Sequence, residues 1–295
     1  MLDFRIKTFL TVCHYMNFTR AAEELNLTQP AVSGHIKHLE DFYGTELFIR
    51  DKKHLTLSEQ GNILYLYLKS MANDEKKIKN LIGNNNKNKK SISLGLTRTI
   101  GEFTIFDRLI DFISREKDRD FYIYYKNTKD ILEDLDNGKI DFALVEGFLR
   151  GHNYYVEKFK NENYICVAHK DYEFKKEIKN LSDLLDERII IREEGSGTLA
   201  FLQNLLNMQN LSTNDFSNII QVNNMHAVVE LLKANAGISF LFESAVRNLL
   251  NNGTLVKIDL EDFKVSHDFS FICNKNSIFI DEYLMIFKKF LLNSK

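Results

Sequence analysis

Two groups of polar side chains in this 295-residue sequence have the types and spacing that ligand binding needs. The first group surrounds the only proline of the chain and combines hydroxyl, amide, imidazole and ammonium groups, which can hydrogen-bond base edges or phosphates. Its members are Thr28, Gln29, Pro30, Ser33, His35 and Lys37. A basic loop with Arg50, Lys52 and Lys53 follows, and its cations could lie along a phosphate backbone.

The second group occupies two places where a strand-like run gives way to a helical one. Its members are Thr97, Arg98 and Thr99 after SISLGL, and Ser196, Gly197 and Thr198 after RIIIREEG. A helix N-terminus attracts anions because its N–H groups are free and its dipole is positive there. Two alternatives stay open: Ser196 and Thr198 could form an ordinary helix cap, and Arg98 could be a surface cation.

Three helical segments in quick succession must position the first group. Apolar periodicity predicts a first helix from Phe4 to Cys13, and Thr19 is expected to cap a short second helix. Thr28 and Pro30 then open a third helix, because proline is harmless only in a first turn. Gly44 follows the end of its apolar pattern, as is typical of a helix stop. A short helix, a turn and a helix with a defined start form a helix-turn-helix arrangement.

The basic loop lies between two apolar, strand-like pieces, around Phe48 and Leu55, and predicts a winged hairpin. The alternative to DNA binding is a small helical packing domain with a solvated polar face. Acidic residues offset the cations of this segment, so affinity for DNA would depend on local charge placement and on doubling of the domain.

A long helix is predicted from Ser58, its cap, to about Ile82. Its apolar residues recur close to a period of 3.5 and so indicate a coiled-coil seam, although an amphipathic helix lying on its own domain fits the pattern too. The seam residues are Leu64, Leu68, Met71, Ile78 and Ile82, with Glu75 interrupting. The polar run NNNKNKK, residues 84 to 90, predicts a hinge.

From Ser91 onward the sequence alternates between strand-like and helical runs, which predicts an α/β fold with a mostly parallel sheet. The expected strands are SISLGL, FYIYY, DFALVE, YICVAHK, RIIIR, GISFLF, TLVKIDL and FSFICN. Helices are expected from Phe103 to Ser114, Thr198 to Leu206 and Ala227 to Ala234. No glycine-rich nucleotide fingerprint or P-loop interrupts them, so no nucleotide cofactor is expected.

Composition excludes several classes of protein. No run approaches ~18 consecutive apolar residues, so no membrane span is expected, and the charged N-terminal segment is unlike a secretory signal. Three distant cysteines fit a reducing cytoplasm and have no zinc spacing, so no metal is expected. Ser196 does not stand in a G-x-S-x-G turn, so no catalytic residue is assigned.

The segment from Phe18 to Gly61 resembles the N-terminal domain of LysR-type transcriptional regulators almost residue for residue. The matching elements are Ala21-Ala22, Leu25, Gln29-Pro30-Ala31-Val32-Ser33, Ile36, Leu39-Glu40, Gly44, Leu47-Phe48, Arg50 and Leu57-Ser58 through Gly61. The landmarks GLTRTIGEF, DFALVEG, IREEGSGT and NNMHAVVELLKANAGISFL resemble the family's effector domain more loosely, and are most similar to regulators of sulfur or carbon-fixation metabolism. Departures from the family are Gly34, which replaces a longer residue, and three absent prolines.

The resemblance implies three parts. These are a winged helix-turn-helix over residues 1–58, a linker helix and hinge over 59–90, and an effector domain over 91–295 that is similar to periplasmic binding proteins. In that domain, lobe one would take 91–161 and 267–295, and lobe two 162–266.

The resemblance also implies the function of a cytoplasmic transcriptional regulator. It would bind double-stranded promoter DNA as a homodimer joined by linker helices, and as a homotetramer of two dimers. A small, anionic metabolite would bind between the lobes, near Thr97, Thr99, Ser196, Thr198 and Asn223, with Glu146 at the crossing between them. The alternative is a solute-binding or enzymatic α/β domain that carries a helical N-terminal packing domain.

Overall fold

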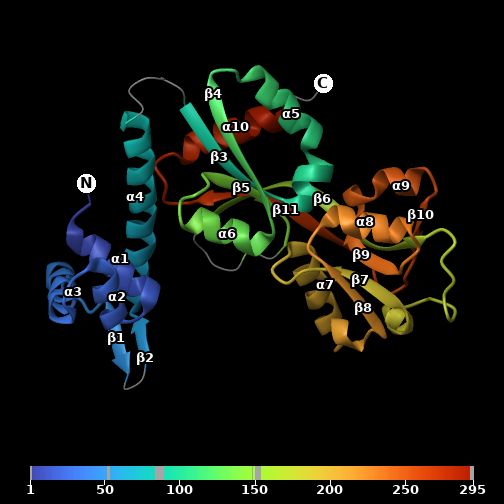
Figure 1. Ribbon diagram of the computed structural model, residues 1–295, viewed down its shortest axis with the longest axis horizontal. Coiled ribbons are helices and arrows are strands. Elements are labelled where there is room, and N and C mark those ends of the chain that lie inside the picture. The colour runs from blue at the N-terminus through green and yellow to red at the C-terminus, as the bar shows by residue number, and fades with distance from the viewer. Residues whose placement is uncertain (1, 52–53, 84–89, 148, 150–153, 293–295) are drawn as a thin grey trace. The chain divides into compact units, whose positions relative to one another are not determined.

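The computed structural model describes residues 2–51, 54–83, 90–147, 149 and 154–292. They form two compact units (Figure 1). Unit 1 comprises Met1–Asn88 together with Asn274–Ile280, and unit 2 comprises Lys89–Cys273 and Asp281–Lys295. No helix of the described residues is both long and apolar enough to cross a membrane.

Unit 1 contains the predicted helix-turn-helix and wing. Its elements are α1 (Phe4–Tyr15), α2 (Phe18–Leu25), α3 (Gln29–Tyr43), β1 (Phe48–Asp51) and β2 (His54–Leu57). The two strands pair antiparallel, with Phe48 opposite Leu57. The apolar faces of the three helices and the base of the wing close over one core, which includes Phe9, Val12, Ala21, Val32, Ile36, Leu39 and Leu47.

The ends of α3 are as the sequence predicts. The Thr28 side chain accepts a hydrogen bond from the backbone N–H of Ala31, and Pro30 lies in the first turn. Gly44 ends the helix at φ +67°, a left-handed conformation that glycine adopts without strain. The start of α3, which carries the candidate DNA contacts, is therefore set by local chemistry.

The predicted cap of α2 at Thr19 is wrong. The helix begins at Phe18, and its cap is Asn17, whose side chain accepts a hydrogen bond from the backbone N–H of Arg20. Asparagine and threonine are both good caps, so periodicity alone could not choose between them.

The long helix α4 (Glu59–Gly83) is capped by the Ser58 hydroxyl, which accepts from the Gly61 N–H at 2.9 Å. Two predicted seam residues belong to another face: Leu68 is buried in the core of unit 1 and Leu64 packs against it. The apolar side chains that α4 leaves exposed are Ile63, Tyr67, Met71, Ile78, Leu81 and Ile82. At 3.6 residues per turn they fall within an arc of roughly 100°.

The exposed stripe of α4 is interrupted at Asp74. This carboxylate is buried and accepts hydrogen bonds from the Ser277 hydroxyl at 2.7 Å and the Ile278 N–H at 3.0 Å. The stripe therefore has an N-terminal part, around Tyr67 and Met71, and a C-terminal part, around Ile78 and Ile82.

Unit 2 is built on one mixed sheet with strand order β4-β3-β5-β11-β6-β9-β7-β8, and β10 pairs with β6. The strands are β3 (Lys90–Thr97), β4 (Arg119–Lys126), β5 (Phe142–Val145), β6 (Tyr154–His169), β7 (Arg188–Arg192), β8 (Asn218–Val222), β9 (Ile238–Phe242), β10 (Leu255–Ile258) and β11 (Val265–Asn274). Strand β3 runs parallel to β4 and β5, and β7 runs parallel to β8 and β9. Pairs of β5 with β11 and of β6 with β9 and β10 are antiparallel, so the sheet is mixed, with the expected parallel pairing inside each group of outer strands.

Helices cover both faces of this sheet (Figure 1). They are α5 (Phe106–Arg115), which follows a π-helix (Ile100–Thr104), α6 (Thr128–Asp136), α7 (Gly197–Met208), α8 (Met225–Lys233), α9 (Arg247–Asn251) and α10 (Ile280–Leu292). We call β3–β5 with α5 and α6 the first half of unit 2, and β7–β9 with α7 and α8 the second half. The long strands β6 and β11 lie between the halves in the sheet order.

Replacing Gly34 by alanine is expected to stabilise unit 1 by about 0.5–1 kcal/mol, because glycine inside a helix costs that much relative to alanine. Gly34 is exposed in α3, and a Cβ there would meet no atom within 4 Å. Urea unfolding monitored by circular dichroism measures the change. Gly61→Ala is the matched control and should destabilise, since its Cβ would overlap the carbonyl oxygen of Leu47. A loss of stability in Gly34→Ala would contradict the helix geometry described.

Candidate functional site

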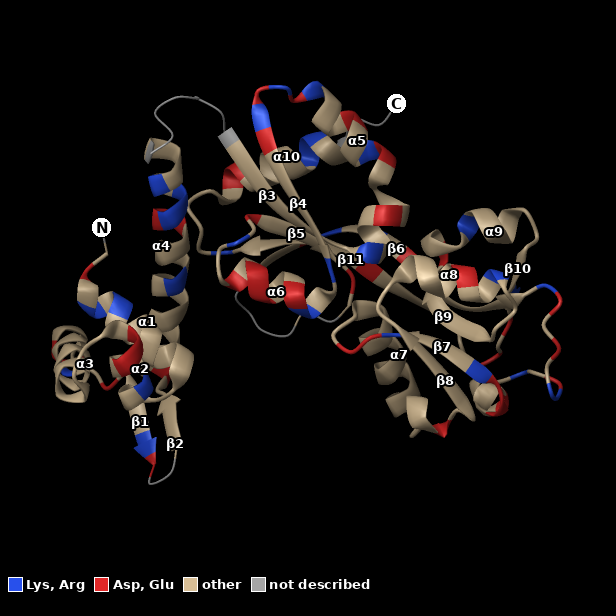
Figure 2. Ribbon diagram, in the orientation of Figure 1, with Lys and Arg blue, Asp and Glu red and all other residues tan. Residues whose placement is uncertain are grey.

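The N-terminal end of α3 presents its predicted DNA contacts to solvent. Thr28, Gln29, Pro30 and Lys37 are exposed, and Ser33 is half-buried. The Gln29 amide donates a hydrogen bond to the Ser33 hydroxyl at 2.8 Å, which orients both side chains. Figure 2 shows that most positions of α3 are uncharged, so this face can offer base-specific hydrogen bonds more readily than a strong positive field.

His35 lies between α3 and α1. Its Nδ1 atom is 3.0 Å from the Thr8 hydroxyl, and the Phe4 ring contacts the imidazole edge-on with centroids 4.9 Å apart. One ring nitrogen is thus occupied within unit 1, and only the other is left for a further partner.

The wing contributes one described cation. Arg50 is exposed on β1, and its guanidinium lies 4.7 Å from the centroid of the Phe18 ring. This cation–π contact holds the Arg50 side chain at the start of α2. Lys52 and Lys53, predicted to lie in the same loop, fall outside the described residues.

A buried polar cluster joins the ends of three segments of unit 2. Thr97 ends β3, Glu146 follows β5, and Ser196 and Thr198 begin α7; all four are at most 3% exposed. The Thr97 hydroxyl donates to the Glu146 carboxylate. Thr97 of one strand-to-helix corner thus contacts Glu146, and the other corner reaches the same residue through Gly197.

Gly197 makes this approach possible. A Cβ at Gly197 would overlap the carbonyl oxygen of Glu146 and crowd the Thr128 hydroxyl. That hydroxyl itself donates to the Glu146 carbonyl oxygen at 3.0 Å. Nearby, the Lys129 N–H donates to the Gly195 carbonyl oxygen at 3.1 Å. The first and second halves of unit 2 are thus in direct backbone contact at α7.

Several polar atoms of this cluster have no hydrogen-bond partner. Buried and unpartnered are the hydroxyls of Thr99 and Thr198 and the Nε of Arg98, even though Thr99 lies beside the Glu146 carboxylate. Ser196 occupies the cap position of α7 without capping it, so the ordinary-cap alternative is not what forms. A buried polar group left unsatisfied costs about 1–3 kcal/mol, and a ligand that supplied the missing partners would recover that cost.

The charges of the cluster include one that the sequence analysis missed. Arg192, at the end of β7, is 4% exposed and makes a two-point ion pair with Glu193 at 2.8 and 3.1 Å. Its charge acts on Glu146 and on Glu102. The available signal was an arginine that follows the apolar run Ile189–Ile191 and is separated by two residues from the Gly195–Gly197 loop.

The protonation of Glu146 is governed by its burial. Desolvation raises the pKa of this carboxyl, while the Thr97 hydroxyl and the Arg192 charge partly offset the rise. The cluster thus contains an acid that is costly to ionise.

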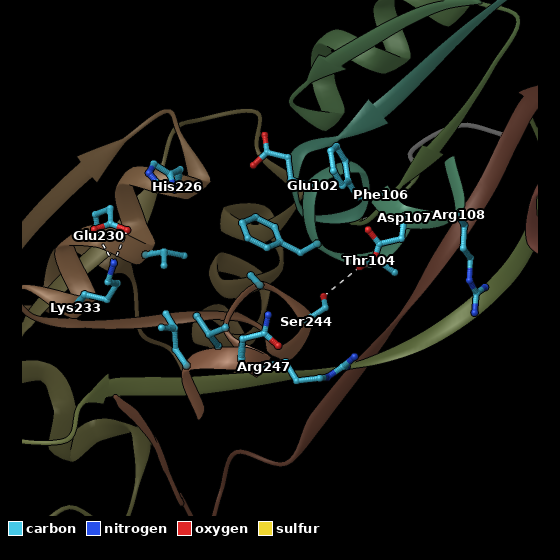
Figure 3. Close-up of a pocket in the computed structure, with 16 residues that line it drawn as sticks. Glu102, Thr104, Phe106, Asp107, Arg108, His226, Glu230, Lys233, Ser244 and Arg247 are labelled. Atoms are coloured by element: carbon cyan, nitrogen blue, oxygen red, sulfur yellow. Dashed lines mark hydrogen bonds and ion pairs between the residues drawn. The ribbon is translucent and has the colours of Figure 1, made fainter. Parts of the chain in front are cut away.

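Unit 2 also contains a cavity of about 580 Å³, which residues from both halves line (Figure 3). Glu102 and Phe106 line it from the first half of unit 2, and His226 and Ser244 from the second half. Thr104 and Ser244 join the halves across it through hydroxyls 3.2 Å apart. Burial raises the pKa of Glu102 against the opposing effect of Arg98, Arg192 and His226, so this side chain links the cavity electrostatically to the buried cluster.

Asn223 differs from the other predicted effector contacts. It is exposed between β8 and α8, and its neighbour Asn224 caps α8 by accepting from the Ala227 N–H. Among the described side chains, no group of three or more histidines, cysteines or acids could hold a metal ion.

Comparison with known proteins covers both units. The model of the LysR substrate binding domain matches residues 85–278, and that of the bacterial regulatory helix-turn-helix protein, lysR family, matches residues 5–62. The chain is 28% identical over 270 residues to the HTH-type transcriptional regulator CysL of Bacillus subtilis, covering 90% of this chain and 89% of CysL. It is 25% identical over 262 residues to the RuBisCO operon transcriptional regulator of Allochromatium vinosum, covering 88% and 85%.

Two solved structures with similar folds contain bound molecules. Full-length LysG from Corynebacterium glutamicum with bound effector Arg gives a TM-score of 0.64 at 12% identity, covering 99% of this chain and 98% of LysG. The CcmR regulatory domain of Synechocystis in complex with 2-PG gives 0.58 at 18% identity, covering 70% of this chain and 99% of that domain. At these identities the likeness concerns the fold.

Glu146→Gln is expected to stabilise unit 2 progressively as the pH rises. Since burial raises the folded pKa of Glu146 above its ordinary value of 4.5, the wild-type loses stability between 4.5 and that raised pKa, and glutamine cannot ionise. Thermal unfolding at pH 5 and pH 8 should show a larger gain over wild type at pH 8. The control is Glu133→Gln on the exposed face of α6, for which no such trend is expected. A gain that is equal at both pH values would contradict the burial argument.

Proposed function

Because this chain belongs to the LysR family of bacterial helix-turn-helix regulators, we propose that it regulates transcription from promoter DNA in response to a small acidic metabolite. The observation that carries the proposal is the pairing of two features in one chain. One is an exposed, sharply started α3 with hydrogen-bonding side chains. The other is a buried cluster of unpartnered polar groups that joins the two halves of unit 2. The proposed location is the cytoplasm, where chromosomal DNA is accessible.

In the proposed complex, α3 enters the major groove and the wing follows the phosphate backbone. The oriented amide of Gln29 and hydroxyl of Ser33 suit base edges, and Lys37 and Arg50 suit phosphates. Two protomers would read half-sites about one helical turn apart, or a multiple of it. Doubling matters here because one copy carries few cations on this face, and a second linked copy raises the effective concentration.

The exposed apolar stripe of α4 is the proposed homodimer contact. Side chains such as Ile63, Tyr67 and Ile82 are more than half exposed, and burying them against a second α4 would remove apolar area from water. The stripe replaces the predicted seam at Leu64 and Leu68, which the core of unit 1 already uses. A homotetramer of two such dimers completes the proposal.

The proposed effector binds between the first and second halves of unit 2. Its acid group would accept hydrogen bonds from the Thr198 hydroxyl and the uncapped start of α7, in keeping with the anion preference of helix N-termini. The cavity lined by Glu102, on which the charges of Arg98 and Arg192 act, is the proposed room for the rest of the molecule. An effector changes activity only if it binds one arrangement of the halves better than another. That CcmR binds 2-PG and LysG binds Arg supports a small-molecule effector for a fold of this kind.

The alternative of a solute-binding or enzymatic α/β domain makes a different prediction for α3. Its exposed polar face would then be a solvated surface, and changes there would leave the function of the protein intact. The relatives CysL and the RuBisCO operon regulator are both transcriptional regulators, which favours DNA binding.

Gln29→Ala is expected to weaken binding to DNA from upstream of the protein's own gene by about tenfold or more, since one good contact to a base edge is worth about 1–3 kcal/mol. An electrophoretic mobility shift titration measures the change. Gln209→Ala, the loss of the same side chain at the exposed end of α7, is the control and should bind like wild type. If wild type and Gln29→Ala bind the DNA equally, the proposed role of α3 is refuted.

A double change of Tyr67→Glu and Met71→Glu should dissociate the dimer at micromolar concentrations, because buried unpaired charges on facing helices are costly. Sedimentation velocity gives the oligomeric state. Lys76→Glu also adds negative charge to α4, but at an exposed position outside the stripe, and should remain dimeric. A double variant that stays dimeric would exclude the stripe as the contact.

Thr198→Val should weaken binding of the effector by about ten- to a hundredfold, since a hydrogen bond to a charged group contributes about 1.5–3 kcal/mol. Isothermal titration calorimetry with sulfate, phosphate and small carboxylates identifies a binding anion and then compares the variant. Thr213→Val, at the start of a short 3-10 helix in unit 2, serves as the control. Unchanged affinities in Thr198→Val would remove α7 from the site.

A further inference from the structure

We propose that the effector carries a hydrogen-bond donor, a hydroxyl or an ammonium, in addition to its acid group, and that Glu146 selects for that donor. This inference rests on the proposed function and names the chemical class of the effector. It follows from three observations. These are the charges around the cluster, the unused acceptor sites of the Glu146 carboxylate and the position of the α7 N-terminus.

The cluster is not a simple anion site, because its own charges nearly cancel. Three carboxylates, of Glu146, Glu102 and Glu193, face the guanidinium groups of Arg98 and Arg192. His226 adds a positive charge near Glu102 only when it is protonated. An inorganic anion would gain from the two arginines and would be repelled by the carboxylates, so charge alone gives it little preference for this place.

Glu146 in particular has acceptor capacity to spare. An ionised carboxylate offers about four lone-pair sites. Among the described residues, the buried Glu146 carboxylate has the hydroxyls of Thr97 and Thr99 and its own backbone N–H beside it, which leaves at least one site for a ligand. Thr128 donates to the backbone oxygen of Glu146 and leaves the carboxylate free. Because burial makes Glu146 costly to ionise, a donor or a cation placed beside it would stabilise its ionised form, so a ligand group placed here should donate.

The hydrogen-bond donors for an acid group lie on α7, across the contact between Gly197 and Glu146. Thr198 is 3% exposed, its hydroxyl is unpartnered, and it lies in the first turn of α7, which has no side-chain cap. At Gly197 this turn lies directly against the backbone of Glu146. A compact molecule with an acid group and a neighbouring donor therefore matches the two sides at once, its acid toward α7 and its donor toward Glu146.

Such a ligand would bridge the halves of unit 2. Its acid group would belong to the second half, through Thr198, and its donor to the first half, through Glu146. Neither half satisfies both groups alone, so binding would favour the arrangement in which the halves touch.

The test uses four probes of graded chemistry on the full chain: sulfate, propionate, lactate and alanine. Lactate and alanine add a hydroxyl or an ammonium to the carbon skeleton of propionate. Titration calorimetry should show that wild type binds at least one of these two tenfold or more tightly than propionate and sulfate. Glu146→Gln should reduce a preference for alanine to less than threefold, because the amide carries no charge, whereas Glu146→Leu should remove a preference for either donor. Glu133→Gln is the control and should keep the wild-type preference.

The outcomes separate this inference from the proposed function. If all four probes bind alike and Thr198→Val weakens them all, the effector site stands and the donor inference is overturned. If the preference exists but survives in Glu146→Leu, Glu146 is not its source. If no probe binds to wild type, both the site and the inference fail. Circular dichroism of each variant shows that a lost preference does not come from unfolding.

Discussion

The contact of Gly197 with the backbone of Glu146 is the constraint on which the proposed effector site depends. Any side chain at that position would overlap a carbonyl oxygen. With glycine there, the first turn of α7 reaches the end of β5 and brings Thr198 and Glu146 into one buried cluster. Gly147 contributes to the same approach, at φ +101° and with its own Cβ position 2.9 Å from the Gly197 Cα. Two glycines on opposite halves of unit 2 therefore replace what would otherwise be side-chain packing between them.

The cost of that approach is a set of buried polar groups that the chain does not satisfy. The hydroxyls of Thr99 and Thr198 lack partners, and burial raises the pKa of Glu146. Folded proteins rarely leave such groups unpaired unless a ligand, a water or a functional strain accounts for them. In the proposed function, a small molecule bound at this cluster would recover that energy and hold the halves of unit 2 in one arrangement.

In unit 1, packing holds one helix, α3, in a fixed orientation. Val32, Ile36 and Leu39 bury one face of α3 in the core. The carboxylate of Glu40 accepts from the Leu47 N–H at 2.9 Å and ties the end of α3 to the wing. The polar face is therefore held by packing, while its side chains remain in solvent. The same reasoning explains why Leu64 and Leu68 of α4 are not available for a dimer contact: the core of unit 1 already takes them.

The sequence by itself determined the features that depend on local chemistry. The start of α3 at Thr28 and Pro30, its end at Gly44, the cap of α4 at Ser58 and the strand-to-helix corner before α7 all follow from one or two neighbouring residues. Only the tertiary structure decided which groups meet: the burial of Arg192, the contact of Thr97 with Glu146, the exposure of Asn223 and the face of α4 that stays free. Periodicity reports that a residue faces a core, but it does not say which core. Long-range pairing depends on how strands and helices pack, and no short stretch of sequence contains that information.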